Sequence, residues 1–487
     1  MTPSSLSALL GSLDVVWKRE PSSMSALTNI QWRTNQCDPG SVLFFQRFDD
    51  GRDDAELIDR YLLASPFAAL VTNKLLDGWT RLPAQTGIYV THPDDYAEVV
   101  RRCCDLIYPL DPSAAVCVGV TGTNGKTTTV KYLEAILAAQ GCRVLTIGTL
   151  GVSLNGTPRF ETGFTSPPLI ELRRLLHAER SHYDVVAMEV SSHALDQGRA
   201  HGISLRSAAW TNFTLDHLDY HHDEARYFAA KSRILDLLEP SGQLVTTSLE
   251  VAERLRSARP GAPIELLRAA EIDRTAVALK PFLALEHNRH NYTLAVALAN
   301  RVLGATDGAH LGREDWRHLA AVPGRFECKV IGKRTLVIDF AHTPDALETI
   351  LSAIRGAFPD AYILTLFGCG GGRDRGKRPL MGAAVARYSD HAIVTSDNPR
   401  FEDPRSIIAD ILTGMPQTGR EVVVERPAAM TRLFEILSAL PEQQPCVALI
   451  AGKGHERYLD IQGQKTPYSD QDQVALHMKR LGWRVSS

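Results

Sequence analysis

Short apolar runs recur along this chain, and segments with helical spacing separate them. After residue 115 the runs read VCVGV, DVVAMEV, AAWTNF and QLVTTS. Segments such as VKYLEAILAAQ and YFAAKSRILDLL stand between them. A regular alternation of strand and helix is typical of a parallel sheet with crossover helices. This part of the chain therefore predicts an α/β unit.

The same pattern restarts after VPGRFE. TLVIDF, AYILTLF, HAIVTSD, EVVVE and CVALIAG read as strands, and DALETILSAI, PLMGAAVARY and RSIIADIL read as helices. This second alternation predicts a Rossmann-like unit. Upstream, SVLFF, AALVTN and GIYVT are shorter strand-like pieces, and YPLDPSAA reads as a linker. We expect an α/β protein of three domains: a mixed α/β domain over 1–112, a central parallel-sheet domain over 113–326 and a Rossmann-like domain over 327–487.

Composition and charge narrow the class of protein. The 487 residues are 44% hydrophobic and 22% charged, with a net charge of −3. These values are ordinary for a globular protein and give no sign of a nucleic-acid partner. No apolar run has the length of a membrane span, and Asp14 and Glu20 interrupt the first twenty residues, so we expect no signal peptide. Eight scattered cysteines without a Cys-x-x-Cys pair indicate free thiols in the cytoplasm.

The segment VCVGVTGTNGKTTTVKYL joins an apolar strand to a helix through a glycine-rich loop. Backbone N–H groups of such a loop, and the helix N-terminus, favour phosphate oxygens. Lys126 would reach the β- and γ-phosphates of a nucleotide, and the Thr127 hydroxyl would bind Mg²⁺. Val120 stands where the strict motif has glycine, so the loop is a variant, and a plain glycine turn is the alternative. The candidate ATP-binding residues are Gly122, Thr123, Asn124, Gly125, Lys126, Thr127 and Thr128.

With this loop the sequence resembles a known family. TGTNGKTTT is similar to the ATP loop of the Mur ligases, which join amino acids to the peptidoglycan precursor. MEVSSHALDQGR, TNFTLDHLDYH, AKSRIL, VPGRFE, VIDFAHTPDAL, FGCGGGRDRGKRPLMG, SDNPR and AGKGHE continue the resemblance in order. Within the family, these strings are most similar to the branch that adds the third residue of the peptide.

The resemblance implies a cytoplasmic, ADP-forming ligase of cell-wall synthesis. Its substrates would be ATP, UDP-MurNAc-L-Ala-D-Glu and meso-diaminopimelate. ATP would phosphorylate the acceptor carboxylate, and the amine would then displace phosphate. Positioning and charge neutralisation are what a protein adds to such a reaction. We expect a monomer without nucleic-acid partners or membrane insertion.

A metal set follows from the same resemblance. Glu189 ends the strand DVVAMEV, and His217 lies in DHLDYH; both are expected to bind Mg²⁺ together with Thr127. The ordinary alternatives are a solvated carboxylate and a hydrogen-bonded histidine. In the family, the lysine matching Lys231 is carbamoylated, which turns a cation into an anion that can bridge a second Mg²⁺. A surface lysine is the alternative. The expected catalytic residues are Lys126, Lys231 and His217.

Two further sets of residues are carried over by the resemblance. One set would hold the muramoyl-dipeptide part of the acceptor: Thr165, Ser166, Ser191, Gln197 and Arg199. The other would meet the nucleotide: His287, Asn288, Asn291, Arg325, His342 and Asp345. Phe164, Leu285 and His287 depart from the usual residues, which are asparagine, glycine and an apolar aromatic. ATP would be clamped between domains, so we expect closure before chemistry.

TSDNPRFEDP, which follows the apolar run HAIV, is either a turn or a binding loop. Asp-Asn-Pro is common in turns. However, the Arg373 loop and the AGKGHE loop also follow strands of the same predicted sheet, so the three loops can converge. Together they offer two guanidinium groups and two carboxylates, which match the two carboxylates and two ammonium groups of meso-diaminopimelate. The candidate residues are Arg373, Asp397, Asn398, Pro399, Arg400, Gly452 and Glu456.

The first domain departs from the family. The stretch NIQWRTNQCDPGSVLFF keeps the proline-glycine pair and the strand, but Trp32, Arg33 and Thr34 replace the expected Asp-Ser-Arg. This departure leaves open a Mur-type amide ligase of another pathway, such as a folylpolyglutamate-like or specialised peptide ligase. A non-catalytic nucleotide-binding homologue is a further alternative. Against it stands the intact set of Lys126, Thr127, Glu189 and Lys231.

Overall fold

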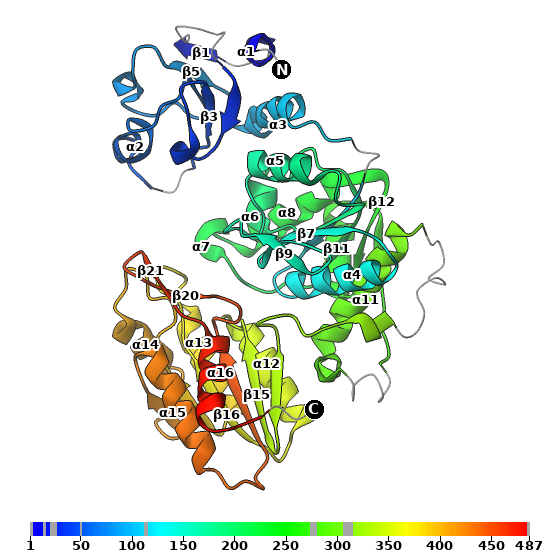
Figure 1. The fold of residues 1–487 in the computed structure, drawn as a ribbon, viewed down its shortest axis with the longest axis vertical. Helices are drawn as coiled ribbons and strands as arrows, with labels where there is room; N and C mark the ends of the chain where they lie inside the picture. Colours follow the sequence, from blue (N-terminus) through cyan, green and yellow to red (C-terminus); the bar gives the residue numbers. More distant parts are fainter. Residues whose placement is uncertain are drawn as a thin grey trace. The chain divides into compact units, whose positions relative to one another are not determined.

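The computed structural model describes residues 3–12, 16–19, 27–48, 51–111, 115–272, 280–304 and 315–484. Figure 1 shows an α/β fold, with three main sheets and a small hairpin. The chain divides into two compact units: residues 1–121, 140–208 and 230–244 form the first, and residues 122–139, 209–229 and 245–487 form the second. This division differs from the predicted domain boundaries near 112 and 326, which stay predictions. Residues 112–114 of the predicted linker lie outside the described residues.

The first unit contains a five-stranded sheet with the order β1-β5-β4-β3-β2. Its strands are β1 (Val16–Arg19), β2 (Asn29–Gln31), β3 (Ser41–Phe45), β4 (Ala69–Thr72) and β5 (Gly87–Val90), and β1 alone of these runs antiparallel to its neighbour. SVLFF, AALVTN and GIYVT are thus confirmed as strands. Helix α3 (Tyr96–Ile107) buries Tyr96, Val99, Val100, Cys103 and Cys104. These positions share one helical face, which is why the helix packs into this core.

Most of the central sheet also belongs to the first unit, and its order is β13-β12-β11-β6-β10-β7-β8-β9. Strand β10 (Val185–Glu189) lies parallel between β6 (Val116–Thr121) and β7 (Val144–Gly148), with Glu189 opposite Val120. The antiparallel strands β8 (Gly151–Leu154) and β9 (Thr157–Phe160) were not foreseen from the sequence. The remaining elements are α5 (Leu169–Glu179), α6 (Ser192–Asp196), β11 (Leu205–Trp210), β12 (Leu238–Thr246) and, in the second unit, β13 (Ile264–Leu266).

Two predicted boundaries in this region are wrong. The strand expected at AAWTNF begins earlier, at Leu205, and ends at Trp210. The helix expected over YFAAKSRILDLL becomes α8 (Glu224–Ser232), and residues 233–237 form a 3₁₀ turn. Leu238 already opens β12, so the chain must leave the helix before that point.

The second unit holds a six-stranded sheet with the order β14-β15-β19-β16-β17-β18. Its strands are β14 (Glu327–Ile331), β15 (Arg334–Asp339), β16 (Tyr362–Phe367), β17 (His391–Val394), β18 (Arg420–Val422) and β19 (Cys446–Ala451). Only β14 is antiparallel among them. Since β19 inserts between β15 and β16, the strand order reverses there. Sheets of this kind bind ligands at such a switch point, beyond the carboxyl ends of the strands.

Three helices between strands of this sheet are confirmed: α12 (Pro344–Ala357), α13 (Lys377–Tyr388) and α14 (Pro404–Leu412). The sequence analysis did not name α15 (Arg426–Ala439), which lies between β18 and β19, or α16 (Asp470–Arg480), which follows β21. The strand expected at EVVVE is shorter than predicted and ends at Val422. Beyond it, Val424 O accepts a hydrogen bond from Ser396 N at 2.9 Å, so this segment supports the loop after β17 instead.

Helices α4 (Lys126–Ala139) and α11 (Glu286–Val302) pack against each other in the second unit. Thr129 Oγ1 donates to Asn291 Oδ1 at 3.3 Å across their interface. This contact fixes the helix that carries the glycine-rich loop at its N-terminus.

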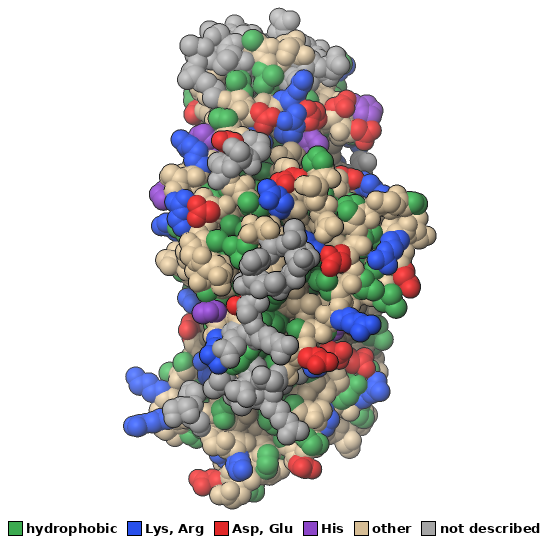
Figure 2. All heavy atoms as spheres, turned by 90° about the vertical axis from the view of Figure 1, so that its right-hand side faces the viewer, with side chains coloured by type: hydrophobic (Ala, Val, Ile, Leu, Met, Phe, Trp, Pro, Cys, Tyr) green, Lys and Arg blue, Asp and Glu red, His purple; other side chains and the backbone are tan. Residues whose placement is uncertain are grey.

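Among the described residues, no helix is both long and apolar enough to cross a membrane. On the face in Figure 2, basic and acidic side chains are interspersed. That mixture agrees with the small net charge of −3.

Candidate functional site

The glycine-rich loop adopts a tight turn at the start of α4. Gly125 has a φ of 84°, and a Cβ atom there would lie 2.4 Å from Asn291 Oδ1, so only glycine fits. Lys126 Nζ donates to the carbonyl oxygens of Gly122 and Thr123, each at 2.8 Å. The lysine thus lies along its own loop, at the N-terminus of α4. This is the arrangement of an anion site.

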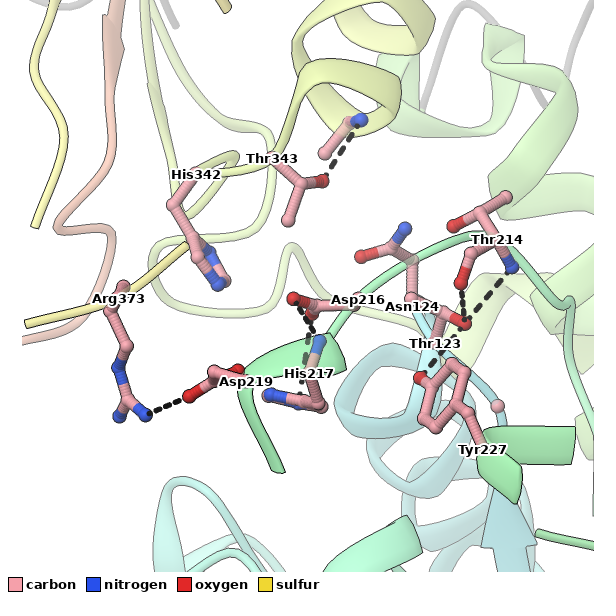
Figure 3. A network of polar contacts seen from close by, with 12 residues as sticks. Thr123, Asn124, Thr214, Asp216, His217, Asp219, Tyr227, His342, Thr343 and Arg373 are labelled. Atoms are coloured by element: carbon pink, nitrogen blue, oxygen red, sulfur yellow. Dashed lines mark hydrogen bonds and ion pairs between the residues drawn. The ribbon is translucent and has the colours of Figure 1, made fainter. Parts of the chain in front are cut away.

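Neighbouring segments hold the loop from outside. Asn124 N donates to Asn212 Oδ1 at 2.9 Å, and Thr211 Oγ1 donates to Asn124 O. Thr123 Oγ1 donates to Thr214 O at 3.0 Å and lies 3.2 Å from the Tyr227 hydroxyl, as Figure 3 shows. The residues after β11 therefore form one wall of the loop.

The start of α12 approaches the same loop. Asn124 Nδ2 donates to Asp345 Oδ2 at 3.3 Å. Thr343 caps the helix by accepting a hydrogen bond from Ala346 N at 3.3 Å. Burial raises the pKa of Asp345. Two sequence-predicted nucleotide positions, Asn124 and Asp345, are thus brought together by the structure.

His217 lies in a charged group of the second unit. It has a φ of 56°, and its Nε2 atom lies 3.6 Å from Asp216 Oδ2. Burial opposes ionisation of Asp216, but His217, His342 and Lys377 hold its pKa below the ordinary value. Figure 3 shows Asp219 reaching toward Arg373, whose Nη1 atom is 3.6 Å from the Asp219 carboxylate.

Three other residues that were predicted to bind the nucleotide, Asn288, Asn291 and Arg325, differ in their contacts. Asn288 is buried and donates to Phe282 O at 3.0 Å. Asn291 donates to Asn288 Oδ1 and lies beneath the glycine-rich loop, so both amides support the loop from inside. Arg325 lies over the Phe340 ring at 4.4 Å.

The junction before the third sheet is also fixed by hydrogen bonds. His342 Nδ1 lies 2.8 Å from Phe340 O, and burial, with Lys377 nearby, lowers its pKa. Asp339, at the end of β15, accepts from Phe326 N and from Ala341 N, each at 2.7 Å. Sequence reasoning did not single out Asp339. Its place at the end of a buried parallel strand was the available signal.

Glu189 is held at the end of β10 in the first unit. Its side chain is buried, with Oε1 accepting from Thr149 N at 2.9 Å and Oε2 accepting from Thr149 Oγ1 at 3.0 Å. Thr149 Oγ1 also lies 3.1 Å from Thr165 Oγ1. Each carboxylate oxygen retains a lone pair beyond these bonds. Thr149, which holds the Glu189 carboxylate, is a second residue of the candidate site that sequence reasoning missed.

The five predicted acceptor residues form one connected group around Glu189. Ser166 Oγ donates to Glu189 O at 2.9 Å and accepts from Ser191 N at 3.1 Å. Arg199 donates through Nη1 to Ser166 O at 3.0 Å and through Nε and Nη2 to Gln197 Oε1. Ser191 caps α6 by accepting from Ala194 N. A cavity of about 280 Å³ borders this group at Gln197 and extends to Glu98, His201 and Arg233.

The two sequence departures of this region touch each other. Trp32 and Phe164 lie edge to face, with ring centroids 5.6 Å apart. The Arg33 guanidinium lies 4.5 Å from the centroid of the Trp32 ring, and the Arg199 guanidinium lies 5.3 Å from that of the Phe164 ring. Substitutions that looked independent in the sequence thus form one pair of contacting aromatic rings, with an arginine beside each ring.

The candidate Mg²⁺ ligands fit a site in which the protein provides only a few oxygen ligands. Within the described ranges, no group of three His, Cys, Asp or Glu side chains could hold a metal by itself. Mg²⁺, however, commonly uses one or two protein oxygen ligands with waters and substrate phosphates. In the first unit, the oriented carboxylate of Glu189 suits that mode. In the second unit, the hydroxyl of Thr127 is a ligand of the same kind. Lys231 has 1% of its surface exposed and lies at the end of α8, so the surface-lysine alternative is wrong.

The predicted amino-acid loops converge as the sequence suggested. The Arg373 loop follows β16, the Asp397–Arg400 turn follows β17 and the Gly452 loop follows β19, and these strands are neighbours. Gly371 N donates to Asn398 O at 2.9 Å, and Asn398 Nδ2 donates to Glu456 Oε2 at 2.8 Å.

Arg400 lies across the glycine-rich segment after β16. Its Nη1 atom donates to Gly371 O. A Cβ atom at Gly370 would lie 3.2 Å from that nitrogen, so the glycines give the guanidinium its space. Arg400 has a φ of 51°, and its backbone pairs with the hairpin of β20 (Tyr458–Ile461) and β21 (Gln464–Pro467).

Buried charges beneath these loops were missed by sequence reasoning. Lys453 is fully buried and contacts Asn398 and Glu456. Arg426 is likewise buried and binds Asp470 through Nε at 3.0 Å and Nη2 at 2.7 Å. The string AGKGHE, with a lysine between two glycines after an apolar strand, was the signal for Lys453.

Comparisons with known proteins agree with this geometry. Residues 120–300 match the Mur ligase middle domain, and residues 324–457 match the Mur ligase, glutamate ligase domain. A protein of Lawsonia intracellularis named UDP-N-acetylmuramoyl-L-alanyl-D-glutamate--2,6-diaminopimelate ligase is 36% identical over 419 residues, covering 78% of this chain and 83% of the relative. A protein of the same name from Synechococcus elongatus is 34% identical, covering 93% of this chain and 94% of the relative.

A solved structure agrees as well. The structure titled UDP-N-acetylmuramoyl-L-alanyl-D-glutamate--2,6-diaminopimelate ligase matches with a TM-score of 0.58 and 25% identity, covering 99% of both chains. The identity, the coverage and the order of the matched domains lead to one conclusion. This chain belongs to the Mur ligase family.

Proposed function

We propose that this protein is an ATP-dependent ligase that joins meso-diaminopimelate to the D-glutamyl carboxylate of UDP-MurNAc-L-Ala-D-Glu. The observation that carries the proposal is the convergence of three loops at the carboxyl edge of the third sheet. They bring together Arg400, Asn398 and Glu456, and hydrogen bonds link them. Opposite charges at fixed positions suit a ligand that carries both carboxylates and ammonium groups.

The reaction has two steps whose atoms balance. The acceptor carboxylate oxygen attacks the γ-phosphorus of ATP, so a P–O bond forms and ADP leaves. The amine then attacks the acyl phosphate, a C–N bond forms, the C–O bond to phosphate breaks, and the amine loses a proton. The protein's contribution is to position both partners and to balance the negative charge of the phosphates.

The loop residues provide the nucleotide part of this proposal. Backbone N–H groups at the start of α4 would receive phosphate oxygens, and Lys126 would exchange a loop carbonyl for a phosphate. Asp345 and His342 would contact the nucleotide from the second unit's sheet. Mg²⁺ would be held by Thr127, Glu189, His217 and carbamoylated Lys231, and it would neutralise developing phosphate charge.

The network around Glu189 provides the acceptor part. Arg199 is oriented by two hydrogen bonds to Gln197 and one to Ser166. A guanidinium fixed in this way can pair with a carboxylate of the acceptor without losing much side-chain entropy. Thr165, Ser166 and Ser191 offer hydroxyl groups beside it.

Mass spectrometry tests the proposal directly. The protein is incubated with ATP, Mg²⁺ and UDP-MurNAc-L-Ala-D-Glu, together with meso-diaminopimelate, L-lysine or no amino acid. We expect a product equal to the acceptor plus meso-diaminopimelate minus water, and little product with lysine. A product with lysine but none with meso-diaminopimelate would contradict the choice of amino acid.

One observation favours a second candidate, a ligase of the same chemistry with a different acceptor. Trp32 and Phe164 replace polar residues next to the acceptor group and contact each other edge to face. The second candidate predicts ATP turnover with an alternative acyl acceptor and none with UDP-MurNAc-L-Ala-D-Glu. Release of ADP in the presence of each acceptor distinguishes the two.

A further inference from the structure

A buried lysine lies beneath the proposed amino-acid site. Lys453 follows β19 between two glycines, and 0% of its surface is exposed. A buried ammonium is strongly unfavourable unless it is paired and hydrogen-bonded. The buried ammonium group of Lys453 therefore requires acceptors and a negative charge close to it.

Each partner of Lys453 belongs to the candidate amino-acid site. Nζ donates to Asn398 Oδ1 at 3.0 Å and to Glu456 Oε2 at 3.0 Å, and it lies 3.5 Å from Asp397 Oδ1. An ammonium has three hydrogens, so these three groups account for all of them. Asn398 and Asp397 come from one loop and Glu456 from another, and the lysine joins the two loops.

The three partners differ in exposure. The Glu456 side chain is 20% exposed, whereas that of Asp397 is 7% exposed. Asp397 also faces Arg426 and His342; burial by itself would raise its pKa, but Lys453 and then Arg426 outweigh burial and hold the pKa below its ordinary value. Glu456 is therefore the carboxylate that can meet an ammonium group from solution, and Asp397 acts through the lysine.

Resting on the function proposed above, we propose that Lys453 is a positioning residue for the incoming amino acid. It neutralises Asp397 inside the fold and holds Asn398 and Glu456 at the distance and orientation that the ligand requires. Two carboxylates and one ammonium leave a single negative charge, which Glu456 presents to the ligand. A change at Lys453 should therefore disturb recognition of the amino acid and leave the nucleotide loop as it is.

The test uses Lys453→Met in the whole 487-residue chain, because methionine keeps a long unbranched side chain and removes the charge. We expect the KM for the amino acid to rise about thirtyfold or more, in line with removal of one partner from a buried charged pair. The KM for ATP should change by less than about threefold. Lys465→Met is the matched control, since Lys465 is exposed and lies over the same Tyr458 ring, at 4.1 Å against 5.5 Å for Lys453. It should behave like wild type.

A second variant separates positioning from stability. In Lys453→Met the Asp397 carboxylate loses its main counter-charge, so the melting temperature should fall. In the double variant Lys453→Met/Asp397→Asn the buried charge is removed, so the melting temperature should recover toward wild type. The KM for the amino acid should stay high in the double variant, because Asn398 and Glu456 still lack the lysine. A packing role alone would give neither the recovery nor the persistent KM defect.

The outcomes separate this inference from the proposed function. If wild type uses a different amino acid, the proposed function is wrong, and the KM comparison is made with that amino acid. If wild type ligates nothing, the melting temperatures of Lys453→Met and the double variant still decide whether the lysine balances Asp397. A KM for Lys453→Met within about threefold of wild type, or a double variant less stable than the single, overturns the role of Lys453.

Discussion

Two lysines of this chain follow a glycine with positive φ after a buried parallel strand. Gly125, before Lys126, has a φ of 84°, and Gly452, before Lys453, has a φ of 111°. Lys126 donates to two carbonyl oxygens of its own loop and is partly exposed, whereas Lys453 is fully buried against an amide and two carboxylates. Carbonyl oxygens leave the positive charge available to an anion, and carboxylates cancel it. The neighbours that other segments provide decide whether a Gly-Lys pair binds a ligand or organises a site.

The largest expected effect tests the proposed phosphate-binding role of Lys126. Lys126→Ala should lower kcat for ligation at least about a thousandfold, since a preorganised cation at the phosphates is lost. Its melting temperature should stay near that of wild type, because the side chain contacts its loop and not a core. ADP release and calorimetry measure the two quantities. Lys131→Ala on the same helix is the control, and full activity of Lys126→Ala would remove the phosphate-loop assignment.

Lys231 sharpens the comparison, because it is buried like Lys453 but is proposed to carry a negative charge. Lys231→Ala should lower kcat by about a hundred- to a thousandfold, and short carboxylic acids should restore part of the activity by taking the place of the carbamate. Native mass spectrometry of wild type should show the added mass of one CO₂. An unmodified mass together with normal activity of the variant would exclude the carbamate.

Arg400 tests the proposal that charge in the amino-acid loops provides selectivity. Arg400→Ala should raise the KM for meso-diaminopimelate by about thirty- to a thousandfold and change that for ATP little, because the distal carboxylate loses a bidentate partner. Arg400→Lys should recover part of the loss, since an ammonium cannot form the fork. Steady-state kinetics with meso-diaminopimelate and lysine give the answer, with exposed Arg405→Ala as the control. Equal weakening for both amino acids would make Arg400 a general structural element.

The smallest effect concerns the support of these loops. The Glu402 carboxylate accepts a hydrogen bond from Gly372 N and forms an ion pair with buried Arg378. The hydrogen bond from Arg378, followed by that from Gly372 N, lowers the pKa of Glu402 from 4.5 to about 2. The folded pKa lies below the unfolded value, so the stabilisation is complete above pH 4.5 and disappears as the pH falls toward 2. Glu402→Gln should lower the free energy of unfolding at pH 7 by on the order of 1–3 kcal/mol.

Calorimetry across pH checks this prediction. The difference in melting temperature between Glu402→Gln and wild type should narrow below pH 4.5. Glu435→Gln is the control, because the Glu435–Arg432 pair is exposed and such pairs contribute little. A difference that does not change with pH would show that the glutamate acts by packing.

The sequence predicted the parallel strands because their apolar runs are long and continuous. It also placed the loops after β16, β17 and β19 at one edge, because strands of one parallel sheet end together. It did not predict β8, β9 or the hairpin β20–β21; each of these strands has only four residues, and every residue of β9 and β21 is exposed. Lys453 and Thr149 were missed since their roles depend on partners far along the chain. The contact between Trp32 and Phe164 could not be inferred, because both residues depart from the family motifs on which the other site residues were assigned.

The hairpin β20–β21 has a consequence for protein engineering. Arg400 N donates to Asp460 O at 3.0 Å, Gln462 N donates to Arg400 O at 2.6 Å, and Asp460 N donates to Asn398 Oδ1 at 3.0 Å. The four-residue turn Asp397–Arg400 is thus one edge of a unit that residues about sixty positions later complete. Transplanting only the sequence DNPR into another ligase would not transfer the hydrogen bonds to the hairpin that fix the conformation of the turn. A transferable specificity cassette would comprise the loop after β16, the turn after β17 and the whole segment from Gly452 to Pro467.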